Sequence, residues 1–153
     1  MKFLLDTNIL LRLSDSSNSA HALAVSAIEH IHRNGHHGVL IPQIVYEFWV
    51  VATRPIAVNG MSMEVDEVDH SITAWTSQFP LLRDDNCVLD DWRVLVVNHQ
   101  IKGKPAHDAR LVASMLRHGV THLLTFNTPD FRRFSGITAI SPDAVVAGRV
   151  TLS

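Results

Sequence analysis

The sequence predicts an α/β fold in which helices cover a central parallel sheet. Short apolar runs that are typical of buried strands alternate along the chain with segments in which apolar residues recur at every third or fourth position. This alternation is typical of parallel sheets covered on both faces. The chain has 153 residues, of which 46% are hydrophobic and 18% are charged. It is therefore long and apolar enough to bury a core, and we expect one domain over residues 1–153.

Five elements are expected in the first third of the chain. In order, they are a strand over 2–5, a helix over 8–13, a helix over 20–34, a strand over 39–41 and a helix over 42–54. Both strands are uninterrupted apolar runs. Asn8 is a candidate N-cap for the first helix, Gly35 is suited to end the second, and Pro42 fits the first turn of the third.

The remainder of the chain is expected to be mostly helical. In order, its expected elements are helices over 65–79, 88–99 and 108–118, a strand over 121–126, a turn over 127–130 and a strand over 137–140. The first two helices are predicted by the spacing of their apolar residues. Gly119 is suited to end the third helix. No strand is expected between the helix that starts at Pro42 and the one that ends before Gly119.

Acidic side chains lie at the ends of the predicted strands. Asp6 follows the first strand, and Asn127 and Asp130 follow the third. Glu47 lies about one turn into the helix after the second strand, and Asp108 opens the helix before the third. Because ligands of open parallel sheets bind beyond the carboxyl ends of the strands, we expect these acids to meet there. Crowded carboxylates repel one another unless a cation joins them, and oxygen ligands favour Mg²⁺ or Mn²⁺ over Zn²⁺.

Each acid also has an ordinary structural explanation. Asp6, Asp108 and Asp130 could each cap a helix or a turn, and Glu47 could be a helix-surface residue. For any acid alone, this explanation is the better one. The joint position of all four at one edge of the sheet favours a metal site instead.

The charges are distributed unevenly along the chain. Residues 1–92 hold 5 basic and 12 acidic side chains, whereas residues 93–153 hold 8 basic and 3 acidic ones. A polyanion would be attracted to the second part. Six cations lie between residues 101 and 140: Lys102, Lys104, Arg110, Arg117, Arg132 and Arg133. The alternative is that these cations only keep the surface soluble.

Four segments resemble, in order, the acidic motifs of PIN-domain nucleases. They are residues 4–10 (LLDTNIL), residues 46–48 (YEF) with 53–55 (TRP), residues 107–113 (HDARLVA) and residues 124–131 (LTFNTPDF). Any one of these matches is weak, but four in the family's order over nearly the whole chain are fairly specific. The compact size resembles the VapC-type toxins of bacterial toxin–antitoxin pairs.

The resemblance implies a Rossmann-like, three-layer α/β/α sandwich and an endoribonuclease that depends on Mg²⁺ or Mn²⁺. The catalytic and metal-binding acids would be Asp6, Glu47, Asp108 and Asp130, with Asn127 as a further metal ligand. Many relatives carry an acid at the position of Asn127, so this site has one charge fewer. The expected RNA products carry 5′-phosphate and 3′-hydroxyl ends.

The resemblance also implies residues that contact the substrate and partners that bind the chain. Asn8 and Thr125 match polar positions near the family's site. Lys104 and Arg110 are candidates for contacts to the RNA backbone, which would supply affinity without sequence choice. A cognate antitoxin protein and a homodimer are expected, as in similar toxins.

Three alternatives remain open at this point. The chain could be a catalytically inactive PIN-like module that binds RNA or protein. Asp6 could be the nucleophile of a phosphotransfer enzyme, although such enzymes need a second acid where this chain has Asn8. A group of four histidines could bind zinc, although no cysteine pair accompanies it: His30, His32, His36 and His37.

The sequence also bears on the compartment of the protein. No stretch approaches 18 apolar residues, so no membrane span is expected. Asp6, Asn8 and Arg12 interrupt the apolar N-terminal run, which argues against a signal peptide. Cys87 is the only cysteine and cannot form a disulfide within the chain. We therefore expect a cytoplasmic protein.

Overall fold

The computed structural model describes residues 1–149 and has a four-stranded sheet at its centre. The elements are β1 (Lys2–Leu5), α1 (Thr7–Ser14), α2 (His21–Arg33), β2 (His37–Val39), α3 (Pro42–Thr53), η1 (Ile56–Val58), α4 (Val65–Gln78), α5 (Val88–Asn98), α6 (Ala106–Arg117), β3 (His122–Leu124), η2 (Thr128–Phe131), β4 (Thr138–Ile140) and α7 (Pro142–Val146). All strand pairs are parallel, in the order β2-β1-β3-β4.

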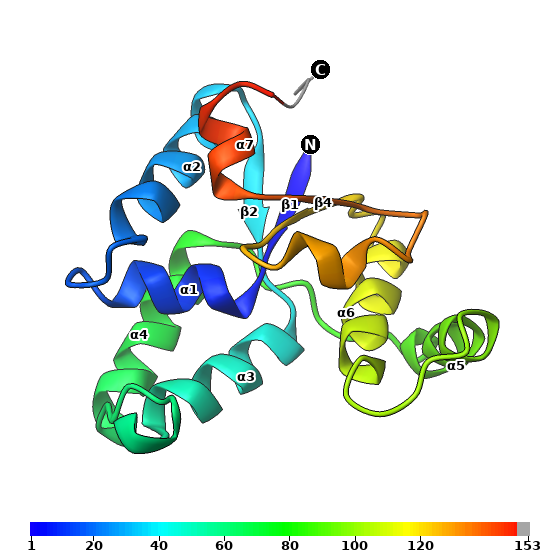
Figure 1. Ribbon diagram of the computed structural model, residues 1–153, viewed down its shortest axis with the longest axis horizontal. Helices are drawn as coiled ribbons and strands as arrows, with labels where there is room; N and C mark the ends of the chain where they lie inside the picture. The colour runs from blue at the N-terminus through cyan, green and yellow to red at the C-terminus, as the bar shows by residue number, and fades with distance from the viewer. Residues whose placement is uncertain (150–153) are drawn as a thin grey trace.

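Helices cover both faces of the sheet, which makes the fold a three-layer α/β/α sandwich. Phe3, Leu4 and Leu5 of β1 are all completely buried. Because successive side chains of a strand point to opposite faces, this burial requires a layer on each side. Figure 1 shows α2 and α7 on one side of the strands and α5 and α6 on the other. The predicted fold class is confirmed.

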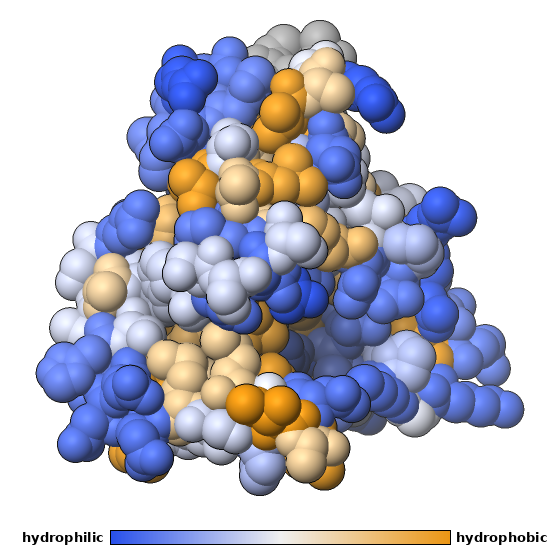
Figure 2. All heavy atoms as spheres, turned by 60° about the vertical axis from the view of Figure 1, so that its left-hand side comes forward, coloured by the Kyte–Doolittle hydropathy of each residue, from blue (hydrophilic) through white to orange (hydrophobic). Residues whose placement is uncertain are grey.

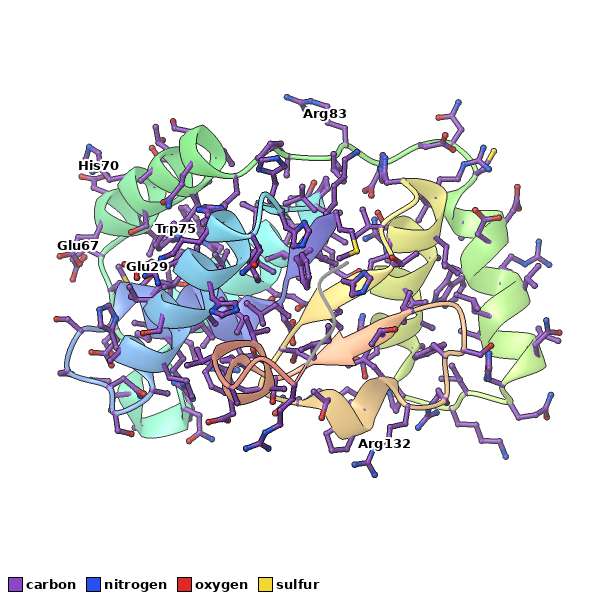
Figure 3. The ribbon with its side chains drawn as sticks, turned by 90° about the horizontal axis from the view of Figure 1, so that it is seen from above. Glu29, Glu67, His70, Trp75, Arg83 and Arg132 are labelled. Carbon is purple, nitrogen blue, oxygen red and sulfur yellow. The ribbon has the colours of Figure 1, made fainter. Side chains whose placement is uncertain are left out.

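The amphipathic character of the central helices explains how they pack. Figure 3 shows Glu67 and His70 pointing outward from α4, whereas Trp75 lies on the side toward α2. Trp75 stacks on Phe79 with ring centroids 6.2 Å apart, and Phe79 lies 6.3 Å from the ring of His32 in α2. The spacing of apolar residues in the sequence therefore marks the buried side of α4, except at its first residue, Val65, which is 57% exposed.

The second strand begins two residues earlier than predicted. β2 is His37–Val39, whereas the apolar run suggested 39–41. Leu40 leaves the sheet and pairs with the segment after α4: its N–H donates to the carbonyl of Pro80 at 2.9 Å. An isolated bridge also joins Leu40 to Leu81, so the middle of the chain is not entirely helical. Both sides of this junction are buried, and apolar character alone cannot separate strand from connection.

Three further features of the helices differ from the predictions. Asp6, not Asn8, is the N-cap of α1, because its side chain accepts a hydrogen bond from Thr7 N–H at 2.8 Å. α6 begins at Ala106, so Asp108 lies inside its first turn and does not cap it. α7 was not predicted, since its five residues are too few for a periodic signal.

No helix between residues 1 and 149 combines the length and apolar composition that a membrane span requires. One hydrophobic core instead draws on both layers of helices and on all four strands. The third helix contributes Ile44 and Phe48, which are both completely buried. The inner face of α3 is therefore anchored in the core. The acid Glu47 immediately precedes Phe48 on this helix.

Truncation of the anchor of α3 should destabilise the fold. Phe48 is completely buried, whereas Tyr46 on the same helix is 64% exposed. Phe48→Ala is expected to lower the free energy of unfolding by about 3–5 kcal/mol, because it leaves a cavity in the core. Tyr46→Ala is the matched control and should change it by less than about 0.5 kcal/mol. Urea unfolding of both variants tests this, and equal midpoints would contradict the burial of Phe48.

Candidate active site

A cleft of about 440 Å³ lies at the carboxyl ends of β1 and β3 and contains all four predicted acids. The polar and charged residues that line it are Asp6, Thr7, Asn8, Glu47, Lys104, Asp108, Asn127, Asp130 and Arg133. They come from α1, α3, the start of α6 and η2, and from residues that flank these elements, which are far apart in the sequence. The parallel sheet therefore assembles the cleft as the strand-end rule predicts.

Asp6 is the most deeply buried of the four acids, with 9% of its surface exposed. One carboxylate oxygen accepts a hydrogen bond from Thr7 N–H at 2.8 Å. The other accepts from the side-chain amide of Asn8 at 2.8 Å and from the hydroxyl of Thr125 at 2.6 Å. Three neutral donors thus fix the carboxylate at the end of the central strand.

Burial dominates the ionisation of Asp6. Its pKa is raised from 3.8 to about 6, chiefly by desolvation and also by the negative charges of Glu47 and Asp108. The hydrogen bonds from Thr125 and Thr7 oppose this shift because they favour the charged form. Ionised Asp6 is therefore costly unless a cation lies beside it.

Glu47 is held by hydrogen bonds to both of its carboxylate oxygens. One oxygen accepts from the hydroxyl of Thr7 at 2.9 Å, and the other from the side-chain amide of Gln43 at 2.8 Å. Gln43 lies one helical turn earlier on α3. Glu47 is half-buried, so one part of its side chain still faces the cleft.

Asp108 and Asp130 form the more accessible side of the cleft. Asp108 is half-buried in the first turn of α6, and Asp130 is exposed on η2, as is Asn127 before it. Desolvation raises the pKa of Asp108, and the negative charges of Asp130 and Glu47 raise it further. Lys104 and Arg133 lower it. The carboxylates therefore act on one another electrostatically across the cleft.

The predicted substrate-binding residues occupy two different environments. Thr125 is completely buried, and its hydroxyl lies behind Asp6. Asn8 lines the cleft, but its amide carbonyl accepts from Phe126 N–H at 3.2 Å and its amide nitrogen donates to Asp6. Both side chains are therefore placed to position Asp6.

The two predicted phosphate contacts are also separated. Lys104 is exposed and lines the cleft of the acids. Arg110 does not line that cleft: it donates to Asp84 at 2.7 Å and to Gln43 at 3.0 Å and faces a neighbouring cavity. Arg133 lines the acid cleft instead, and the sequence marked it only as one cation in a group of six.

Gln43 is the site residue that the sequence analysis missed. Its spacing of four residues before Glu47 places both side chains on one face of α3, and this spacing was the available signal. Arg132, by contrast, points away from η2 into solvent in Figure 3. Proximity in sequence to the acids therefore does not decide which polar residues reach the cleft.

The donor set of the cleft fits a hard divalent cation. Its acids and Asn127 offer only oxygen ligands, which suit Mg²⁺ or Mn²⁺. Within residues 1–149, no three His, Cys, Asp or Glu side chains are close enough to hold one ion as they stand. The histidines at residues 30–37 form no such group either. Binding of a cation to the acids would require their side chains to converge.

The fold of this chain is similar to that of several solved structures. VapBC-1 from nontypeable Haemophilus influenzae has a TM-score of 0.70 and 15% identity over 94% of this chain and 99% of that chain. VapBC2 from Rickettsia felis, bound to a promoter DNA fragment, has a TM-score of 0.67 and 14% identity, covering 92% and 98%. VapC20 from Mycobacterium tuberculosis, described as a Sarcin-Ricin loop cleaving toxin, has a TM-score of 0.60 and 12% identity, covering 84% and 92%.

Sequence comparisons give the family directly. Comparison with curated proteins at the sequence level found no match. The sequence model of the PIN domain matches residues 3–137, which include β1 to β3 and all four acids of the cleft. Since this match covers most of the 153 residues, the chain belongs to the PIN domain family.

Proposed function

We propose that this chain is a metal-dependent endoribonuclease and the toxin of a toxin–antitoxin pair. The observation that carries the proposal is that Asp6, Glu47, Asp108 and Asp130 all line one cleft at the carboxyl edge of the sheet. Membership of the PIN domain family supports a nuclease. The cation is Mg²⁺ or Mn²⁺, and the products carry 5′-phosphate and 3′-hydroxyl ends.

Positive side chains at the rim support a phosphodiester substrate. Lys104 and Arg133 line the acid cleft, and their charges partly offset those of the acids. A second cavity of about 470 Å³ shares Glu47 and Asp108 with the cleft and adds Arg54 and His107. An RNA backbone would therefore meet the cationic side chains of Lys104 and Arg133 in the acid cleft and of Arg54 in the adjoining cavity.

Each residue group has a distinct part in the proposed hydrolysis. Asp6, Glu47, Asp108 and Asp130, with Asn127, would hold the cation. A bound cation is a Lewis acid, which would activate water and neutralise charge on the phosphate. Thr7, Asn8 and Thr125 hold the carboxylates in place through the hydrogen bonds described above. Lys104 and Arg133 orient the phosphodiester by charge, with no choice of base.

The proposed partners are an antitoxin protein and a second copy of the chain. Two of the similar structures above are VapBC assemblies, and one toxin is described as cleaving the Sarcin-Ricin loop. Figure 2 shows hydrophobic patches among hydrophilic residues on one face of the molecule. Exposed large hydrophobic residues include Tyr46, Val50 and Ile56. Exposed hydrophobic residues of this kind are suited to contacts with other proteins. We also propose a cytoplasmic location.

Loss of one carboxylate should abolish cleavage while the fold remains. Asp108→Asn is expected to reduce RNA cleavage by more than about 100-fold, since even residues that only support metal ligands are worth about 10–100-fold. Asp6→Asn/Asp108→Asn should cost little more, because the acids act as a unit. The assay is cleavage of RNA by purified protein with Mg²⁺ or Mn²⁺, with circular dichroism as the fold control.

Four outcomes of these experiments would count against the proposal. Near wild-type cleavage by Asp108→Asn would remove Asp108 from the site. RNA cleavage by the wild type that survives chelation, or that disappears on further purification, would contradict the proposal that this protein is a metal-dependent ribonuclease. RNA or protein binding without cleavage would favour the alternative of an inactive PIN-like module.

Lys104 should contribute to RNA affinity through charge. Lys104→Ala is expected to weaken binding of single-stranded RNA more at low salt than at high salt, and to reduce the salt slope by about 0.7. Lys102→Ala is the matched control, since Lys102 is exposed on the same loop but does not line the cleft. Binding measured at several salt concentrations by fluorescence anisotropy tests this. Equal slopes for both variants and the wild type would assign Lys104 to solubility alone.

The raised pKa of Asp6 predicts a pH-dependent stability in chelator. The folded state holds a proton on Asp6 up to about pH 6, whereas the unfolded chain releases it near 3.8. Stability is therefore lost as pH rises through this window, by about 3 kcal/mol. Asp6→Asn lacks this titration, so its melting temperature should rise relative to wild type from pH 4 to pH 7 in EDTA. Millimolar Mg²⁺ or Mn²⁺ should narrow the difference at pH 7.

The comparison needs thermal melts of both proteins at each pH, with chelator and with metal. A difference in melting temperature that stays constant from pH 4 to pH 7 in EDTA would show that Asp6 ionises normally. A difference at pH 7 that metal leaves unchanged would argue against a cation at the carboxylates.

A further inference from the structure

A chain of side-chain hydrogen bonds connects the acid cleft to the neighbouring cavity. Gln43 donates its amide N–H to Glu47 at 2.8 Å and to the backbone carbonyl of His107 at 2.9 Å. Its amide oxygen accepts from Arg110 at 3.0 Å, and Arg110 donates to Asp84 at 2.7 Å. This series of hydrogen bonds therefore runs from the acidic segment before α5 to a carboxylate of the cleft.

The chemistry of these partners leaves Gln43 only one amide orientation. The carboxylate of Glu47 and the carbonyl of His107 are acceptors, so both must face the amide nitrogen. The guanidinium of Arg110 is only a donor, so it must face the amide oxygen. A flipped amide would set like groups against each other at all three contacts. Arg110 thus selects the orientation in which Gln43 donates to Glu47.

Gln43 also spans the two helices that carry acids of the cleft. Glu47 is on α3, four residues after Gln43, and His107 immediately precedes Asp108 in the first turn of α6. The Gln43 side chain is only 6% exposed, so its hydrogen bonds are protected from water. The position of Glu47 relative to Asp108 is consequently fixed through one amide.

We propose that Gln43 is a positioning residue of the metal site, and that Arg110, held by Asp84, sets its orientation. This inference rests on the proposed function, because it concerns the carboxylates that would hold the cation. Gln43 fixes one oxygen of Glu47 and the helix turn that carries Asp108. It therefore reduces the freedom that these two acids lose on converging around an ion. Arg110 acts on the cleft through Gln43 and does not contact RNA.

Mn²⁺ binding to the full-length protein tests the proposal without a substrate. Gln43→Met keeps the approximate size of the side chain and removes its hydrogen bonds, and is expected to raise the Kd for Mn²⁺ about tenfold. Gln78→Met is the matched control on an exposed part of α4 and should bind Mn²⁺ as the wild type does. Calorimetric titration gives the Kd, and melting in EDTA reports the fold separately.

Arg110→Met tests the role of the hydrogen bond from Arg110 to Gln43. It should weaken Mn²⁺ binding by less than Gln43→Met, and the double variant should bind no more weakly than Gln43→Met alone. A direct contact of Arg110 to RNA predicts the opposite pattern: unchanged Mn²⁺ binding and a lower salt slope for RNA. If Gln43→Met does not fold, Arg110→Met decides the proposal through its Mn²⁺ affinity.

The possible failures are distinguishable. Wild-type Mn²⁺ affinity in Gln43→Met and Arg110→Met would overturn the positioning role and leave the nuclease intact. Additive losses of Mn²⁺ affinity in the double variant would contradict the proposal that Arg110 acts through Gln43, since residues that act independently have additive effects. A wild-type protein that neither binds Mn²⁺ nor cleaves RNA would overturn both the proposed function and this inference.

Discussion

The burial of a carboxylate at the end of the central strand is the constraint on which the rest of the site depends. Asp6 directly follows β1, which is flanked by β2 and β3 in the sheet, so its side chain is enclosed on several sides. Burial raises its pKa to about 6 despite hydrogen bonds that favour the charged form. In the absence of a cation, the ionised site costs free energy that the apolar core must offset. A ligand that compensates this charge would recover part of that cost.

The surrounding polar groups restrict where the carboxylates can move. Thr7 donates its backbone N–H to Asp6 and its hydroxyl to Glu47, so one residue of α1 connects two acids. Thr125 approaches Asp6 from the end of β3, and Gln43 approaches Glu47 from the preceding turn of α3. Asp130, in contrast, is exposed on η2. The site therefore has a fixed inner side at Asp6 and Glu47 and a more accessible outer side.

The sequence predicted the features that depend on local pattern and on the strand-end rule. Apolar runs located β1, and alternation with helices indicated the parallel sandwich. The register of β2 and the bridge from Leu40 to Leu81 were not predictable, because buried connections and buried strands are equally apolar. Gln43 was missed for a different reason: its spacing from Glu47 was visible, but its role also depends on partners 64 and 67 residues away.

The charge distribution bears on the prediction that Arg110 contacts RNA. The second part of the chain is basic, but two of its arginines pair with acids of the first part when the chain folds. Arg110 pairs with Asp84, and Arg117 pairs with Asp85 at 3.1 Å. Part of the asymmetry is thus cancelled within the structure.

The cations that line the acid cleft are those outside these pairs. Lys104 and Arg133 make no ion pair with another side chain in the portion of the chain that the structure describes, and both lower the pKa of Asp108. Pairing of Arg110 and Arg117 therefore separates two kinds of cation that look alike in the sequence. Those bound to acids connect α6 to the segment before α5, whereas those beside the carboxylates leave the cleft with charge of both signs. A site with both signs can attract a phosphodiester and a divalent cation together, which neither acids nor cations alone would do.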